Sequence, residues 1–202
     1  MAAVENLYAE RPSAPRRVKQ VMEAAETCFR LHGFHGTSMA QIAASAKMSV
    51  GHIYRYFPAK DDIIAAIVER DVAAAMADFD AVEGDEAGVF PAFFRHWRAK
   101  IERMSERGCS ILWLEIMSEA ARNPRAARVM ADFRASVAER LCALVQAGAP
   151  GRWTPEAAAE KVELLMLLTD AVAFKAISEP HYDAQRTADT FVSYARCIFE
   201  QA

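Results

Sequence analysis

The 202-residue sequence predicts an all-α protein of about nine helices. Apolar residues recur at three- and four-residue spacing along most of the chain. No stretch shows the sustained alternation of apolar and polar residues that marks a half-buried strand. Beyond the first fifteen residues, every proline falls at or near the edge of a periodic segment, where proline is tolerated.

The chain begins with a segment that has no periodicity. Residues 1–15 contain two prolines and are expected to form a flexible arm. Arg11, Arg16 and Arg17 could reach phosphates or a minor groove, and a leader that only aids solubility is the alternative. Residues 16–32 then form an amphipathic helix, which a glycine ends as a natural C-cap.

Two short helices joined by a tight turn are predicted within residues 37–60. Ser38 and Gln41 have the spacing of a capping box, and the next apolar residues recur at i, i+3, i+4 and i+7. Ser49 can cap the second helix, and Pro58 disfavours helix at the residue before it. The outer face of this pair is aromatic and basic, which suits the major groove of double-stranded DNA.

The charge of the chain is unevenly distributed. Residues 11–60 hold eight Lys and Arg residues against two Glu residues, a net charge of +6, so the remainder carries −9. A basic head on an acidic body is typical of a nucleic-acid-binding protein with one oriented face. A chance cluster on a solvated helix is the alternative.

Residues 16–65 resemble the DNA-binding domain of the TetR family of transcriptional regulators. The similarity is carried by Gly33-Phe34-His35-Gly36-Thr37-Ser38, Gln41-Ile42-Ala43, Ser49-Val50-Gly51, Ile53-Tyr54-Arg55-Tyr56-Phe57 and Lys60. The chain has Lys47 where the family often has Gly, which would cost about 1 kcal/mol if the backbone there is left-handed. The resemblance implies a three-helix helix-turn-helix domain at 16–60, a connecting helix at 61–79, and a ligand-binding and dimerisation domain at 80–202.

The resemblance and the outward positions together give the candidate DNA contacts. Hydroxyl groups at the N-terminus of the first short helix can hold a phosphate. Tyr54 and Lys60 match family positions that hold the DNA backbone, while Arg55 and Gln41 have the bidentate chemistry for guanine and adenine. The candidate set is Thr37, Ser38, Gln41, Lys47, Ser49, Val50, Gly51, His52, Tyr54, Arg55, Tyr56 and Lys60.

An acidic, glycine-containing loop at 81–88 precedes five predicted body helices, at about 90–105, 108–121, 124–147, 155–178 and 183–201. The helix at 155–178 is apolar nearly all the way round, so it must be covered on all sides. The resemblance implies that one side meets a second copy, giving a homodimer through the last two helices. Burial within a monomer is the alternative.

Aromatic and Met residues are frequent on the body helices, a pattern as typical of a plain core as of a ligand site. The resemblance implies a cavity that takes a small hydrophobic or aromatic effector. The candidate lining residues are Phe93, Trp97, Trp113, Met117, Met166, Asp170 and Phe174.

No catalytic residue, cofactor or metal site is predicted. The sequence has no glycine-rich phosphate loop, H-E-x-x-H motif or G-x-S-x-G motif. The four cysteines are widely spaced without a C-x-x-C pair, as expected of reduced small apolar residues, although redox sensing is an alternative. No apolar run is long enough for a membrane span and no signal-peptide core is present, so a cytoplasmic protein is expected.

These observations predict a dimeric, ligand-responsive repressor that binds a palindromic operator and is released by its effector. Residues 112–124 resemble a segment of family members that control efflux, including multidrug efflux, or catabolic genes. The alternatives are a DNA-binding regulator whose body only dimerises, and an activator of transcription.

Overall fold

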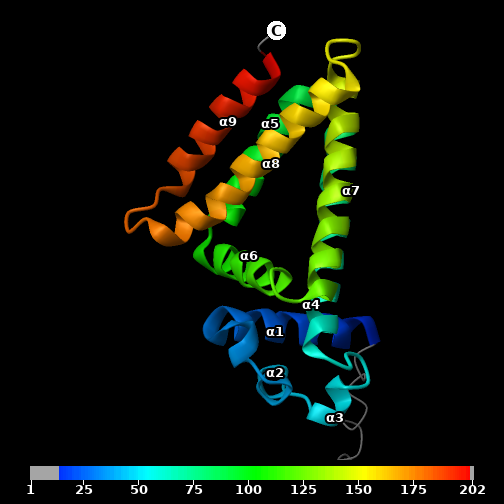
Figure 1. The fold of residues 1–202 in the computed structure, drawn as a ribbon, viewed down its shortest axis with the longest axis vertical. Coiled ribbons are helices and arrows are strands. Elements are labelled where there is room, and N and C mark those ends of the chain that lie inside the picture. Colours follow the sequence, from blue (N-terminus) through cyan, green and yellow to red (C-terminus); the bar gives the residue numbers. More distant parts are fainter. Residues whose placement is uncertain (1–13, 201–202) are drawn as a thin grey trace, which may run out of the picture. The chain divides into compact units, whose positions relative to one another are not determined.

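The computed structural model describes residues 14–200, and all regular secondary structure within them is helical, as predicted (Figure 1). The helices are α1 (Ala14–Gly36), α2 (Met39–Ser45), α3 (Val50–Ile53), α4 (Lys60–Glu83), α5 (Val89–Met104), α6 (Arg107–Ala120), α7 (Pro124–Gly148), α8 (Pro155–Ser178) and α9 (Ala184–Glu200). Residues 1–13 of the expected flexible arm lie outside the described residues. Ala14 and Pro15 already belong to α1, because proline is tolerated in the first helical turn.

The chain divides into two compact units, with the boundary between Ala66 and Ile67 inside α4. The first unit, called the head below, holds α1 to α3 and the start of α4. The second unit, called the body, holds the rest of α4 and α5 to α9. The continuous helix α4 thus contributes residues to both units.

The head is a small helical unit with its own apolar core. Val21 and Phe29 of α1, Ile42 of α2, Ile53 of α3 and Ile63 of α4 are each at most 1% exposed. Burial of such side chains contributes roughly 1.5–3 kcal/mol each relative to full exposure. This packing compensates for the short length of α2 and α3, which would not be stable alone.

Local features of the head agree with the sequence. Gly33 has φ 72° and interrupts α1 where a C-cap was predicted. The capping box is present, because Gln41 N donates to Ser38 Oγ (3.2 Å) and Ser38 N donates to Gln41 Oε1 (2.7 Å). Lys47 has φ 52°, so its backbone is left-handed, as is typical of a position where the family often has glycine. Helix α3 is shorter than expected, since turns follow it from Tyr54.

The body packs its helices around an aromatic and aliphatic core. Phe93, Trp97 and Ile101 of α5 are 0–3% exposed, and α9 lies along α5 and covers this face (Figure 1). Helix α8 packs against α6 and α7, with Leu165 fully buried. Phe93 and Trp97 stack with ring centroids 5.0 Å apart, which fixes the core around large rings. No helix among residues 14–200 is long and apolar enough to cross a membrane.

Candidate functional site

The turn and second helix of the helix-turn-helix expose two positive charges. Lys47 lies in the left-handed turn and Arg55 is the second residue after α3, and both residues are exposed. Neither side chain has an ion pair or hydrogen bond with any of residues 14–200. By contrast, Lys19 and Arg30 on α1 each lie 3.8 Å from a glutamate one turn away. The cations that the head leaves unneutralised therefore include two at the predicted DNA face.

Gly51 on α3 is not explained by packing within the protein. It is exposed, its φ is not positive, and a Cβ added there would have no protein atom within 4 Å. Glycine inside a helix costs about 1 kcal/mol relative to alanine. A glycine at this position leaves the surface of α3 free of a side chain, so that another backbone can approach it closely.

Two candidate contacts face the interior of the head. Thr37 is 2% exposed, and its hydroxyl donates to Gly33 O (2.8 Å). The Lys60 ammonium donates to Phe34 O and Thr37 O (2.6 Å each) and lies 4.4 Å from the centre of the Phe34 ring. Both residues therefore hold the segment before α2 in place, a role that spacing along the chain did not reveal.

The helix caps use three more of the candidates. Ser38 and Gln41 are engaged in the capping box, so the bidentate pairing of Gln41 with adenine would require the cap to open. Ser49 accepts from His52 N (3.3 Å) at the start of α3. These groups fix the orientation of the two helices.

The remaining candidates form the outer face of α3 and the turn after it. Tyr54 is 49% exposed and Val50 is 36% exposed. His52 and Tyr56 are half-buried, with the Tyr56 hydroxyl 3.4 Å from His52 Nε2. This face combines hydroxyl, imidazole, guanidinium and methyl groups, which are the groups that read base edges in a major groove.

The candidate effector residues fall into three groups: three share the buried body core, two are half-buried on α6, and Phe174 is exposed. Phe93, Trp97 and Met166 are buried in the body, while Trp113 and Met117 of α6 are half-buried. The Trp113 ring lies 6.1 Å from that of Phe133 on α7. Phe174 is 64% exposed and therefore lies on the outer surface of α8, away from this group.

Polar groups lie on the inward faces of three body helices. Trp97 Nε1 donates to Thr169 Oγ1 across 3.3 Å, joining α5 to α8. Arg134 of α7 and Asp170 of α8 form a half-buried ion pair of 2.5 Å. Sequence reasoning found Asp170 but missed Thr169 and Arg134. Their positions, one turn from buried apolar residues on the same helices, were the available signal.

Lys100 was also missed, although it lies three residues after Trp97 on α5. Its ammonium is 4.8 Å from the centre of the Trp97 ring. Burial lowers the pKa of the Lys100 amine, the positive charge of Arg103 lowers it further, and Asp78 and Asp170 oppose the shift. An apolar environment disfavours the charged form of a lysine.

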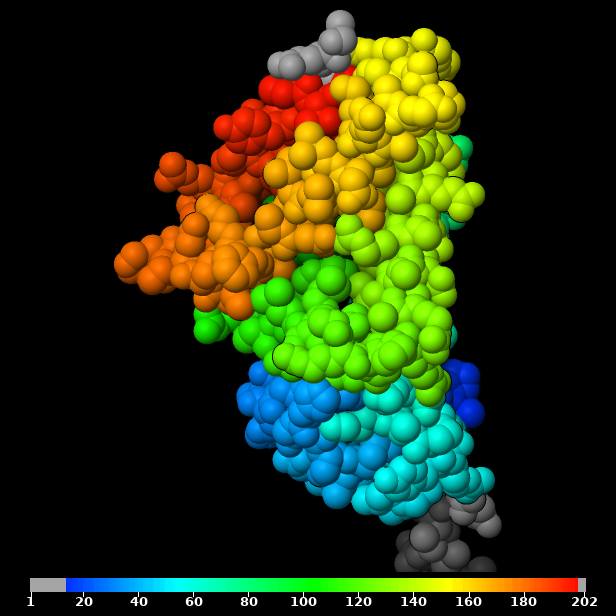
Figure 2. Space-filling view, in the orientation of Figure 1, coloured from blue at the N-terminus to red at the C-terminus, as the bar shows by residue number. Residues whose placement is uncertain are grey.

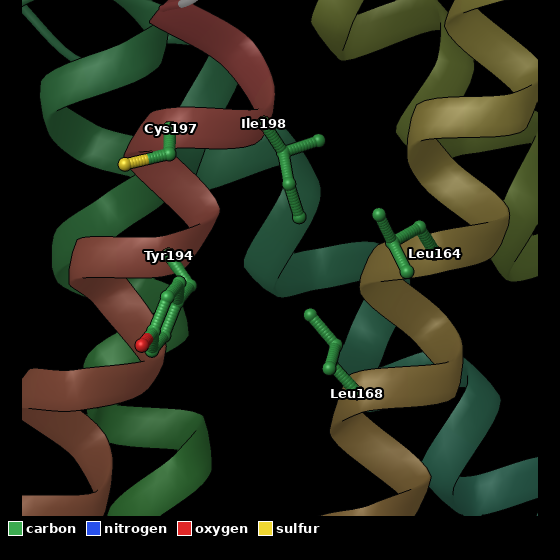
Figure 3. Close-up of a pocket in the computed structure, with 5 residues that line it drawn as sticks. All are labelled: Leu164, Leu168, Tyr194, Cys197 and Ile198. Atoms are coloured by element: carbon green, nitrogen blue, oxygen red, sulfur yellow. The ribbon is translucent and has the colours of Figure 1, made fainter.

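Helices α8 and α9 also present an apolar surface to solvent. In the space-filling view, side chains of α8 lie at the surface between α7 and α9 (Figure 2). Leu164, Leu168, Tyr194, Cys197 and Ile198 line a groove of about 360 Å³, in which α8 and α9 face one another (Figure 3).

The last helix turns only some of its apolar residues outward. Phe191, Ala195 and Phe199 are at most 7% exposed and pack into the body. The outer face of α9 is instead formed by Tyr194 with its neighbours in the groove. Cys197 is exposed, so it does not pack as a small apolar residue of the core. No group of three His, Cys, Asp or Glu residues within 14–200 could hold a metal ion.

The shifted pKa of Lys100 gives a pH-dependent prediction. A lysine whose pKa is lower in the folded chain destabilises the fold fully below that folded pKa, and the cost disappears as pH rises towards the ordinary value of 10.5. We expect Lys100→Met to be more stable than the parent at pH 7, with a smaller gain at pH 10. Urea unfolding at both pH values measures this. Lys161→Met controls for the loss of one cation over a tryptophan ring, and a pH-independent gain for Lys100→Met would contradict the prediction.

Comparison with known proteins agrees with both units. Residues 21–67 match the family model of bacterial regulatory proteins of the tetR family, and residues 102–198 match that of the C-terminal part of BetI-type transcriptional repressors. The transcriptional regulator UidR of Escherichia coli is 30% identical over 139 residues, which are 67% of this chain and 66% of UidR. The chain thus spans about two thirds of that relative.

Solved structures share the fold. A putative transcriptional regulator from Pseudomonas aeruginosa PAO1 is 19% identical with a TM-score of 0.79, and the match covers 95% of this chain and 94% of that one. A putative transcriptional regulator from Saccharomonospora viridis, solved in complex with choline, is 18% identical with a TM-score of 0.68 and coverages of 89% and 95%. Taken with the family models and the helix-turn-helix geometry, these matches show that the chain belongs to the TetR family of bacterial transcriptional regulators, which are not enzymes.

Proposed function

We propose that the protein is a dimeric repressor that binds a palindromic DNA operator through its helix-turn-helix and is released by a small effector bound in the body. The observation that carries the proposal is the exposed face around α3. Lys47 and Arg55 lack internal ion partners there, and Gly51 leaves an open patch between side chains of base-reading chemistry. Phosphate contacts would come from exposed Tyr54 and from the N-terminus of α2, which Lys60 and Thr37 hold in place.

The outer face of α8 supports the dimer. Leu164, Leu167, Leu168 and Phe174 of α8 are 37–64% exposed, and Leu164 and Leu168 line one groove with Tyr194 of α9. Leaving so many large apolar side chains in water is unfavourable, at about 25 cal/mol for each Å² of apolar surface. A second copy presenting the same face would cover them by two-fold symmetry.

The body supports an effector site between α5, α6, α7 and α8. Trp113, Met117 and Phe133 are only half-buried although they lie on packed helices. The same helix bundle contains the hydrogen bond of Trp97 to Thr169 and the ion pair of Arg134 with Asp170. Apolar walls with a few polar groups are typical of small-molecule sites. The choline complex of the structural neighbour is consistent with ligand binding in this fold.

A body that only dimerises is the second candidate. It is favoured by one observation: Phe93 and Trp97 are at most 3% exposed and stack directly on each other, so side chains fill that part of the interior. Such a protein would bind DNA in the same way, but no small molecule would change its affinity for the operator.

Fluorescence anisotropy on labelled duplexes from the protein's own upstream region tests the proposed function. We expect selective binding that weakens steeply with salt, because lysine and arginine contacts to phosphates release counterions. A panel of aromatic compounds should contain one that lowers operator affinity at least tenfold, which needs about 1.4 kcal/mol of coupling. Equal affinity for an unrelated duplex would refute operator recognition, and selective binding unaffected by any compound would favour the second candidate.

Gly51→Ala should have opposite effects on folding and DNA binding. Alanine fits the open space and favours the helix, so the free energy of unfolding should rise by up to about 1 kcal/mol. The added methyl group would hinder close approach of DNA, so operator affinity should fall about tenfold. Gly84→Ala, an exposed substitution at the end of α4, is the matched control and should leave DNA binding unchanged. Unchanged operator affinity of Gly51→Ala would exclude this patch from the DNA contact.

Leu167→Glu should disrupt the dimer. Leu167 is 54% exposed in the single chain, so the substitution costs the folded monomer little but would bury a charge between two copies. Analytical ultracentrifugation should show a dimer for the parent and a monomer for the variant. Leu31→Glu changes an exposed leucine of the head and should remain dimeric. A dimeric Leu167→Glu protein would place the interface elsewhere.

A further inference from the structure

Three exposed side chains on α2, α3 and their turns have the chemistry to pair with two atoms of one base. Gln41 lies on α2, Lys47 lies in the turn between the helices, and Arg55 lies in the turn after α3. A bidentate pair discriminates well between bases, because both of its hydrogen bonds must fit the same base edge. The hydrogen bonds that each side chain already makes indicate which of them can read the operator.

Gln41 is committed to the start of α2. Its side-chain oxygen Oε1 accepts from Ser38 N (2.7 Å) and from Ser38 Oγ (2.9 Å), and an amide oxygen has two lone pairs. Pairing with adenine needs the same oxygen to accept from N6 of the base while Nε2 donates to N7. Gln41 can therefore read adenine only if α2 loses its cap.

Lys47 lies in a turn whose backbone is held by its neighbours. Gln20 of α1 donates from Nε2 to Ala46 O (2.7 Å), and Met48 N donates to Ala43 O (2.9 Å). The ammonium of a lysine is a compact point charge without a planar group to match to a base edge. Lys47 on this turn therefore suits a phosphate, a contact that positions the protein without reading sequence.

The guanidinium of Arg55 is uncommitted, since it makes no hydrogen bond or ion pair with any part of the chain that the structure describes. Its planar fork of donors matches O6 and N7 of guanine. Arg55 continues the helical turn, because its backbone N donates to His52 O (3.3 Å). A helical side chain covers the turn before its own Cα, and that turn holds Gly51, where an added Cβ would meet no protein atom within 4 Å. A base edge can therefore come close to the guanidinium.

The other polar side chains on this face offer single hydrogen bonds. His52 Nε2 lies 3.4 Å from the Tyr56 hydroxyl, and both residues are half-buried. The Ser49 hydroxyl accepts from His52 N (3.3 Å) as the cap of α3. These groups can add to binding, but none of them can form the two-point pair that Arg55 can form with guanine.

We propose that Arg55 is the main specificity-determining residue and pairs with one guanine in each half-site, while Lys47 holds a phosphate and Gln41 only caps α2. Arg55 has this role only in the operator-binding regulator proposed above, so the inference rests on the proposed function. In a two-fold symmetric dimer, the guanine falls at one pair of symmetry-related positions of the palindrome.

Selection from a random-sequence duplex library, followed by anisotropy on single-base variants of the selected operator, tests this assignment with the full chain. We expect the parent to select guanine at one symmetric pair of positions and to lose about tenfold or more in affinity when both are replaced. Arg55→Gln should lose the guanine preference at this pair and keep the preferences at all other positions. Arg55 is exposed and makes no side-chain contact to lose, so the variant should fold like the parent.

A modified base tests whether the contact is direct. Replacing the two guanines by 7-deazaguanine removes only N7, so operator affinity of the parent should fall several-fold. Arg55→Gln should bind the two operators equally, because it no longer uses that acceptor. Equal losses in both proteins would show that the guanine is read by another group.

Lys47→Gln removes the other exposed cation of this face and is the matched control. It should weaken binding to all duplexes alike, lower the salt dependence by about one phosphate contact and keep the guanine preference. Gln41→Ala should keep every base preference of the parent, although its head should unfold more easily without the cap.

Selective binding whose guanine preference survives in Arg55→Gln would overturn the assignment and leave the operator-binding regulator standing. So would a selected operator without a symmetric pair of guanines, or the loss of an adenine preference in Gln41→Ala. If the parent selects no sequence from the library at all, the proposed function fails together with this inference.

Discussion

Helix α8 is the element on which the rest of the body depends, because it is apolar on nearly every side. Its inner face places Val162, Leu165 and Ala173 at 0–1% exposure among the other body helices. Its outer face leaves three leucines and Phe174 in water. Neighbouring helices on one side alone cannot bury all the apolar side chains of such a helix. The requirement to cover both faces links the body core, the polar pair at Asp170 and the proposed dimer in a single element.

The head follows a different principle, since its helices are too short to supply much stability themselves. The head is held together by a few buried apolar residues and by hydrogen bonds from side chains to the backbone. Lys60 contributes two of these hydrogen bonds, because its charged ammonium donates to two carbonyl groups in the segment that leads into α2. The charged groups of the head are therefore divided between holding the motif together and facing outward, as Lys47 and Arg55 do.

The sequence predicted the elements with local signals well, and the interior of the body less well. Capping at Ser38, the break at Gly33 and the left-handed Lys47 were predictable because short-range chemistry determines them. Lys100 and Arg134 were missed because charged residues on amphipathic helices usually face solvent, and only the packing of neighbouring helices shows that these two face inward. For the same reason, composition alone grouped outward-facing Phe174 with the core aromatics.

Lys47 and Gly51 lie four residues apart, and the fold would be more stable with other residues at both. Glycine at 47 would remove the left-handed strain, and alanine at 51 would favour α3, without displacing any neighbouring atom at 51. The turn and α3 should consequently open locally more often than the packed body, and their amide protons should exchange with solvent sooner. A turn and helix that open locally can adjust their side chains to different base sequences. Each time they become ordered on a duplex, however, they lose conformational entropy.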